Sequence, residues 1–107
     1  MKKELEDKYK NLFAKYKGAD PEIYGDVYTC EELEKEGKLI AGNFYQVQNI
    51  SMGSSSTRID LKGVTLKGSR VVPLNSIVFD FYEITQNSIK EIDIYNDKRF
   101  NPYMMEM

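Results

Sequence analysis

The sequence contains no histidine and no tryptophan, and Cys30 is its only cysteine. Without histidine, the chain lacks the commonest general base and the commonest ligand of transition metals. A single cysteine excludes an internal disulfide bond and a zinc site built from cysteines. A chain without a disulfide framework is typical of a reducing compartment, so we expect this protein in the cytoplasm.

Long apolar runs are also missing. No stretch approaches the roughly 18 apolar residues of a membrane-spanning helix, and residues 1–8 contain no apolar segment of a signal peptide. The net charge of −2 argues against a dedicated binder of double-stranded DNA, because neutralising the phosphates requires a basic excess. We therefore expect neither a membrane partner nor duplex DNA as the main partner.

The composition that remains is that of a globular protein. The chain has 107 residues, of which 41% are hydrophobic and 30% charged, which is ordinary for one folded domain. We expect a single domain over residues 1–107. It would consist of a helical part (1–41), a β-core (42–95) and a C-terminal tail (96–107).

The β-core is predicted from alternating side chains. Residues 44–50, 57–61 and 76–82 alternate with the period of a β-strand, and residues 89–95 form a shorter run. Gly63 suggests a bulge, after which residues 64–66 continue the chain as a bent strand. These runs predict a strongly bent antiparallel sheet of four or five strands, resembling an SH3-like or OB-like small barrel.

Two helices are predicted before this sheet. Residues 2–17 carry an apolar stripe at helical spacing, made of Leu5, Tyr9, Leu12, Phe13 and Tyr16. The spacing of Thr29 and Glu32 matches a capping box, which predicts a short helix over residues 30–36 that ends at Gly37. Together these elements predict an α+β fold with both helices packed on the sheet. The first helix has the alternative role of binding a partner or dimerising, and an open helix-on-sheet layer is the alternative architecture.

Three surfaces are candidates for binding. A basic surface could follow the backbone of single-stranded nucleic acid, with Phe44 or Tyr45 as a stacking platform; its residues are Arg58, Lys62, Lys67 and Arg70. An acidic surface on the short helix would attract a protein with a basic groove; its residues are Glu31, Glu32, Glu34 and Glu36. In the tail, Phe100 and Tyr103 would either close over the β-core or dock onto a protein.

Catalytic chemistry is not indicated. The sequence cannot supply a histidine for a Ser or Cys triad. Glu91 and Asp93 share one face of the last predicted strand and could bind a divalent cation, but a solvated polar face explains them better. We therefore expect no enzyme activity, no cofactor and no metal.

The stretches Gly42-Asn-Phe-Tyr-Gln-Val47, Asn75-Ser-Ile-Val-Phe-Asp-Phe-Tyr82, Asp93-Ile-Tyr95 and Arg99-Phe-Asn-Pro-Tyr103 resemble small proteins of phages and prophages in Gram-positive bacteria. The resemblance covers about residues 39–103. It implies a short accessory protein made in the cytoplasm of a bacterial host cell, of the kind that binds and blocks host machinery.

Three functional hypotheses follow. The first is a non-enzymatic phage accessory protein that binds a host or phage protein stoichiometrically, as an inhibitor of a host defence or regulatory complex. The second is a small barrel that binds single-stranded nucleic acid. The third is a structural or assembly component that forms a homo-oligomer.

Overall fold

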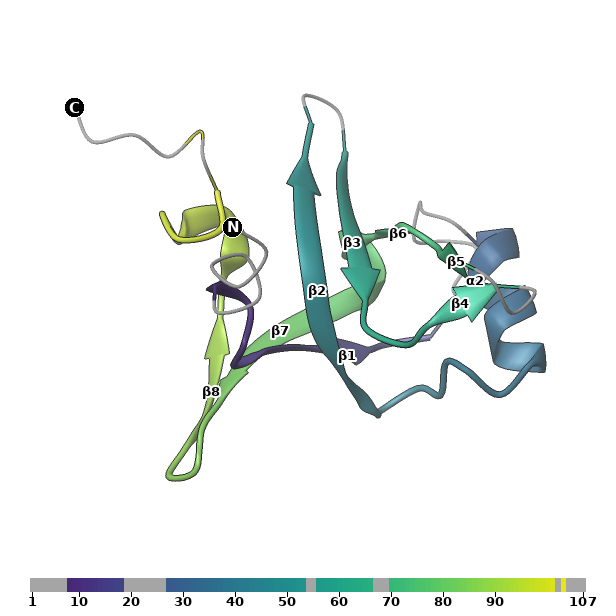
Figure 1. Ribbon diagram of the computed structural model, residues 1–107, viewed down its shortest axis with the longest axis horizontal. Coiled ribbons are helices and arrows are strands. Elements are labelled where there is room, and N and C mark those ends of the chain that lie inside the picture. Colours follow the sequence, from purple (N-terminus) through teal and green to yellow (C-terminus); the bar gives the residue numbers. More distant parts are fainter. Residues whose placement is uncertain (1–7, 19–26, 54–55, 67–69, 102, 104–107) are drawn as a thin grey trace.

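The computed structural model describes residues 8–18, 27–53, 56–66, 70–101 and 103, with the backbone alone for residues 27, 28, 66, 70 and 71. Its main element is a six-stranded antiparallel sheet in the order β6-β3-β2-β1-β7-β8 (Figure 1). The strands of this sheet are β1 (Leu12–Tyr16), β2 (Phe44–Met52), β3 (Thr57–Leu61), β6 (Leu74–Asn75), β7 (Phe79–Ile84) and β8 (Ile89–Ile92). A separate two-stranded ribbon joins β4 (Thr65–Leu66) and β5 (Arg70–Val71).

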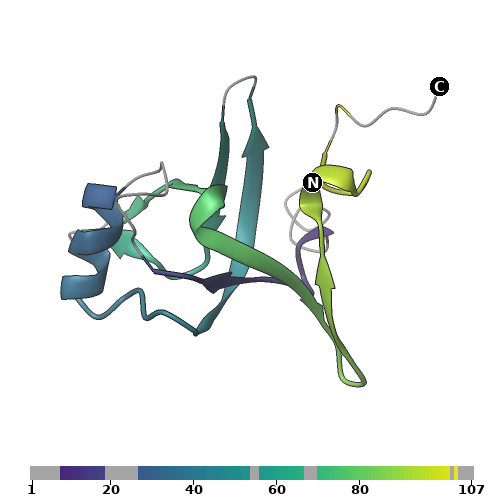
Figure 2. The ribbon, with the colours of Figure 1, turned by 180° about the vertical axis from the view of Figure 1, so that it is seen from behind.

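Strand β2 links the two halves of the sheet. Its first residues pair with β1, where Phe44 lies opposite Lys15, and its later residues pair with β3. The pairing with β3 shifts register between Val47 and Asn49, and such an irregularity increases the local bend and twist. Figures 1 and 2 show that the helix α2 (Val27–Lys35) lies at one end of the molecule and β8 at the other.

The predicted barrel is wrong, because the sheet is open. Strands β6 and β8 end the strand order and do not pair with each other among the described residues. The chain after β8 turns into a short 3-10 helix, η2 (Ile94–Asn96), whose N-cap Asp93 accepts a hydrogen bond from the Tyr95 N–H at 3.0 Å. The chain therefore leaves the sheet after β8, and no later described residue adds a strand to it.

The predicted N-terminal helix is also wrong over its described part. Residues 12–16 form β1, in the middle of the sheet, and residues 2–7 lie outside the described residues. Leu12, Ala14 and Tyr16 are buried, whereas Phe13 and Lys15 are half-buried on the other face. Partner strands on both sides supply the hydrogen bonds of β1, and this tertiary pairing overrides the helical propensity of the segment.

A helix does form in the second predicted region, where it starts earlier than expected. Helix α2 begins at Val27 and ends at Lys35. Gly37 follows in the left-handed conformation (φ +76°), and the Lys38 N–H donates to the Leu33 carbonyl oxygen at 2.9 Å. Glycine at this position lets the chain reverse without strain and satisfies a carbonyl of the last helical turn.

The strand predicted over residues 57–61 is confirmed, whereas the one over residues 76–82 is displaced. Residues 76–78 form a 3-10 helix, η1, that Asn75 caps by accepting a hydrogen bond from the Ile77 N–H at 3.1 Å. Strand β7 therefore starts at Phe79. This explains why Ile77 is 42% exposed while Phe79 and Phe81 are buried.

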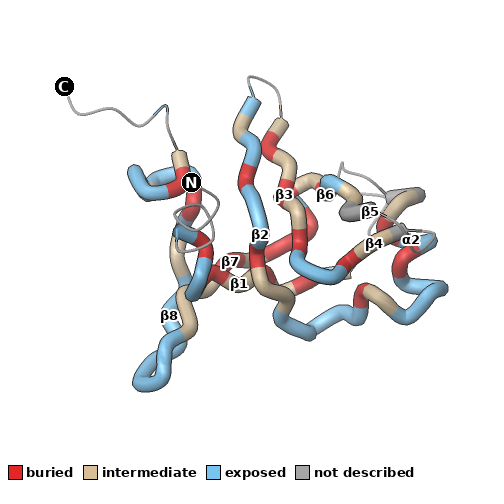
Figure 3. Tube along the Cα trace, viewed as in Figure 1, coloured by how far each residue is buried: buried red, intermediate tan, exposed pale blue. Residues whose placement is uncertain are grey.

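The core lies on one face of the sheet. It takes buried side chains from five strands, from Cys30 and Leu33 of α2, and from Ile94 and Phe100 of the C-terminal segment. Figure 3 shows buried segments along β1, β3 and β7 and an exposed β7–β8 turn. The opposite face of the sheet, which we call the outer face, is left without a covering layer of described residues.

Candidate functional site

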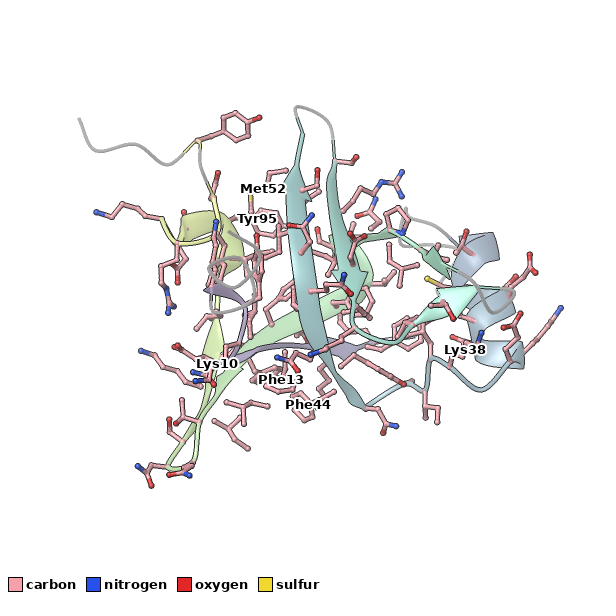
Figure 4. All side chains as sticks on the ribbon, viewed as in Figure 1. Lys10, Phe13, Lys38, Phe44, Met52 and Tyr95 are labelled. Carbon is pink, nitrogen blue, oxygen red and sulfur yellow. The ribbon has the colours of Figure 1, made fainter. Side chains whose placement is uncertain are left out.

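The outer face carries an apolar patch instead of the polar side chains expected on a solvated face. In the register of the sheet, Phe13 of β1 lies opposite Tyr82 of β7, and Ile84 lies opposite Ile89 of β8. Phe44 of β2 joins them from the neighbouring strand (Figure 4). We call these five residues the outer patch. Phe44 is 41% and Ile89 65% exposed, and exposed apolar side chains gathered on one face mark interaction surfaces.

Two of the three aromatic rings in the outer patch, those of Phe44 and Tyr82, are in direct contact. The rings of Phe44 and Tyr82 meet edge to face with centroids 5.2 Å apart. The ammonium group of Lys15 lies over the Phe44 ring, 5.8 Å from its centroid. These contacts orient the rings, which therefore form a preorganised surface with little side-chain entropy left to lose on binding.

Charges of both signs surround the outer patch. Lys15 lies opposite Asp80, and Lys17 forms an ion pair with Asp80 at 3.6 Å. Glu91 lies opposite Tyr82. Partial burial raises the pKa of the Tyr82 phenol, and the negative charges of Glu91 and Asp80 raise it further. An apolar centre with a mixed charged rim is the usual composition of a protein–protein interface.

The predicted basic surface is only partly assembled. Arg58 is half-buried on β3 and Lys62 is exposed just after it, with Asp60 between them in the sequence. Burial raises the pKa of the Asp60 carboxyl group, and a hydrogen bond from Asn49 partly offsets this rise. Lys67 lies outside the described residues and Arg70 is described by its backbone only. Binding of nucleic acid by this basic surface stays a prediction, and the described part of the surface contains the acidic residue Asp60.

The predicted acidic surface is divided by internal contacts. Glu34 accepts a hydrogen bond from the buried Tyr16 hydroxyl at 2.6 Å, and Glu36 pairs with Lys38 at 2.9 Å. Glu31 and Glu32 remain exposed, beside Lys35 and Glu36 in a shallow groove of about 450 Å³. Two of the four carboxylates are therefore engaged in contacts within the protein, and a partner at this surface would meet mainly the other two.

Tyr16 links the sheet to α2, and we expect Tyr16→Phe to destabilise the protein. The side chain is fully buried; this burial raises the pKa of its hydroxyl, as does the hydrogen bond to Glu34. Losing a hydrogen bond to a charged group should lower the free energy of unfolding by about 1–3 kcal/mol. Urea denaturation measures this effect. Tyr103→Phe is the matched control, because the Tyr103 hydroxyl makes only a 3.3 Å bond to the Met52 carbonyl at the surface; equal losses in both variants would contradict the assignment.

The two tail residues predicted for binding lie in different environments. Phe100 is buried and its ring stacks on that of Tyr9, with centroids 5.9 Å apart. Tyr103 is 70% exposed. Arg99 forms ion pairs with Asp97 at 2.7 Å and with Glu83 at 3.1 Å, and the hydrogen bond from Arg99 lowers the pKa of Asp97. Phe100 thus serves the core, and only Tyr103 faces outward for a partner.

Candidate catalytic groups do not converge in the described part of the chain. Cys30 is buried in the core, and no group of three or more acidic or cysteine side chains there is placed to hold a metal ion. Glu91 and Asp93 are exposed, and Asp93 already accepts hydrogen bonds within η2. In the part of the chain that the structure describes, no helix is long and apolar enough to cross a bilayer.

Sequence reasoning missed the outer patch because it assigned Phe13 to a helix. Alternation along Leu12–Tyr16 is the signal that would have found it, since it puts Phe13 and Lys15 on a face of their own. Alternation also separates Phe44 from Tyr45 and Val47, but by itself it suggests only a stacking platform for nucleic acid. The neighbours of Phe44 in the patch, Phe13 and Tyr82, come from strands that only the sheet order brings together.

Comparison with known proteins gives a family. The family model described as bacteriophage T4 protein Y07B matches residues 11–106. No curated protein and no solved structure matches the chain. The match supports the resemblance to phage proteins, but it lends no support to a Gram-positive host or an SH3-like fold. Because the match covers most of the chain, this protein belongs to the bacteriophage T4 protein Y07B family.

Proposed function

We propose that this phage protein acts without catalysis, by binding another protein through the outer patch. One observation carries the proposal: Phe13, Phe44 and Tyr82 lie on the sheet face opposite the core, where the rings of Phe44 and Tyr82 are in contact. Aromatic side chains dominate the binding energy of protein interfaces, and hot spots are rich in them. Folding does not require these aromatic rings to be exposed, because the hydrophobic core lies on the other face of the sheet.

A protein partner fits the surrounding charges better than nucleic acid does. Binding single-stranded nucleic acid relies on a positively charged groove beside the aromatic rings. Lys15 and Lys17 lie on the same face as the outer patch, but Asp80 forms an ion pair with Lys17 and Glu91 lies opposite Tyr82, so acids partly offset the positive charge that phosphate groups would need. A protein partner can place acidic groups against the lysines around the patch and basic groups against the carboxylates.

The phage family suggests the biological setting of this binding. We propose that it takes place in the cytoplasm of the bacterial host. A host defence or regulatory complex is the target class that we put first, and occupying one of its surfaces would inhibit it. The alternative, a structural role in an assembly of the phage's own proteins, would use a protein–protein contact through the same outer patch.

Capture from a lysate tests the proposal. The tagged protein should retain a defined protein in stoichiometric amount from infected cells, and Phe44→Ser and Tyr82→Ser should abolish the retention. Ile77→Ser is the matched control, because Ile77 is as exposed as Phe44 but lies in η1. Retention of nucleic acid instead of protein, lost at high salt, would overturn the proposal.

A further inference from the structure

Resting on the proposed function, we infer that a second copy of this chain, packed face to face, covers the outer patch when no other protein occupies it. The argument starts from the register of β1 and β7. Phe13 lies opposite Tyr82, and Lys15 lies opposite Asp80. Each pair joins two different but complementary side chains, an aromatic pair and a pair of opposite charges.

This arrangement is self-complementary about a two-fold axis. If the axis runs along the strands between β1 and β7, it exchanges the positions of the two strands on the facing copy. Phe13 then packs on Tyr82 of the second copy, and Lys15 faces Asp80 of the second copy. Symmetric dimers need such a surface, which offers each group its own complement, and facing sheets pack through side chains at a spacing of about 10 Å.

The next pair of strands extends the match. Gln46 of β2 continues the row on one side of Phe13, and Glu91 of β8 continues it on the other side of Tyr82. The same axis places Gln46 opposite Glu91 of the second copy, where the amide can donate to the carboxylate. No like charges meet in this row.

Pairing through the sheet edge is a poorer route to a dimer. Two copies of β8 that pair antiparallel about its centre place either Lys90 against Lys90 or Glu91 against Glu91. Directly opposed like charges destabilise strand pairing, and charged residues are a common protection of edge strands. The outer face, where opposite charges meet, is therefore the surface on which a second copy fits.

An exchange of charges tests the dimer. Lys15→Glu places two acids against each other across the axis, and Asp80→Lys places two bases there. Each variant should weaken dimerisation by at least roughly tenfold, and it should do so while remaining folded by circular dichroism, because both side chains are half-exposed. Mixed in equal amounts, the two variants should dimerise again, since the introduced glutamate of one variant faces the introduced lysine of the other. Sedimentation velocity measures the masses.

A second variant keeps the test decisive if either charge reversal unfolds the chain. Gln46→Lys should tighten the dimer, because it places a base opposite Glu91 of the second copy. A wild-type protein that stays monomeric at high micromolar concentration, or a mixture that stays monomeric, overturns the inference. Capture of a different protein that depends on Phe44 would then leave the proposed function standing, whereas binding of oligonucleotides through Phe44 would remove both.

Discussion

Replacing Leu12 with alanine should lower the free energy of unfolding by about 2–5 kcal/mol, whereas Phe13→Ala should cost about 1 kcal/mol or less. The two residues are adjacent, but β1 points them to opposite faces of the sheet. Leu12 is 2% exposed and belongs to the core, so its truncation leaves a cavity. Phe13 lies in the outer patch, where water can fill the space.

Denaturation of both variants in urea measures these losses, with dimerisation followed in parallel. The Phe13 variant should stay folded and lose self-association. A helix over this segment would place Leu12 and Phe13 on the same buried stripe, so similar large losses at both positions would contradict the strand.

Phe100→Ala should destabilise the protein by about 3–5 kcal/mol. The Phe100 ring is 4% exposed, stacks on Tyr9 and has the Arg99 guanidinium carbon 5.0 Å from its centroid. Removing it would weaken the packing of the C-terminal segment on the sheet, because Phe100 and Ile94 are buried side chains that this segment contributes to the core.

Tyr103→Ala is the control for this prediction. Tyr103 lies three residues further on but is 70% exposed, so its loss should change the free energy of unfolding by only about 0.5 kcal/mol. Thermal unfolding of both variants separates the two positions. A stable Phe100 variant would show that the tail does not pack on the core.

Local patterns in the sequence are informative where the side chains of a strand alternate clearly between a buried, mainly apolar face and a polar face. In Thr57–Leu61, the buried Ile59 and Leu61 alternate with Arg58 and Asp60, and the predicted strand matches β3 to the residue. The stop at Gly37 is likewise readable, since a positive φ after a helix favours glycine.

The errors come from residues whose environment is set by distant strands. Phe13 and Tyr16 fit a helical stripe as well as a strand, and only pairing with β2 and β7 decides between the two. The barrel is predicted from bends and turns, but closure depends on whether the edge strands meet, which local spacing does not encode. The outer patch depends on both features, so it could not be assembled from the sequence.

Hydroxyl-radical footprinting tests the central claim most directly, because it reports which aromatic side chains a bound protein covers. We predict that oxidation of Phe44 and Tyr82 falls as the protein is concentrated or saturated with a captured partner, while oxidation of Tyr103 stays constant. Unchanged oxidation of Phe44 and Tyr82 together with protection of Tyr103 would contradict the account and would place the contact on the C-terminal segment.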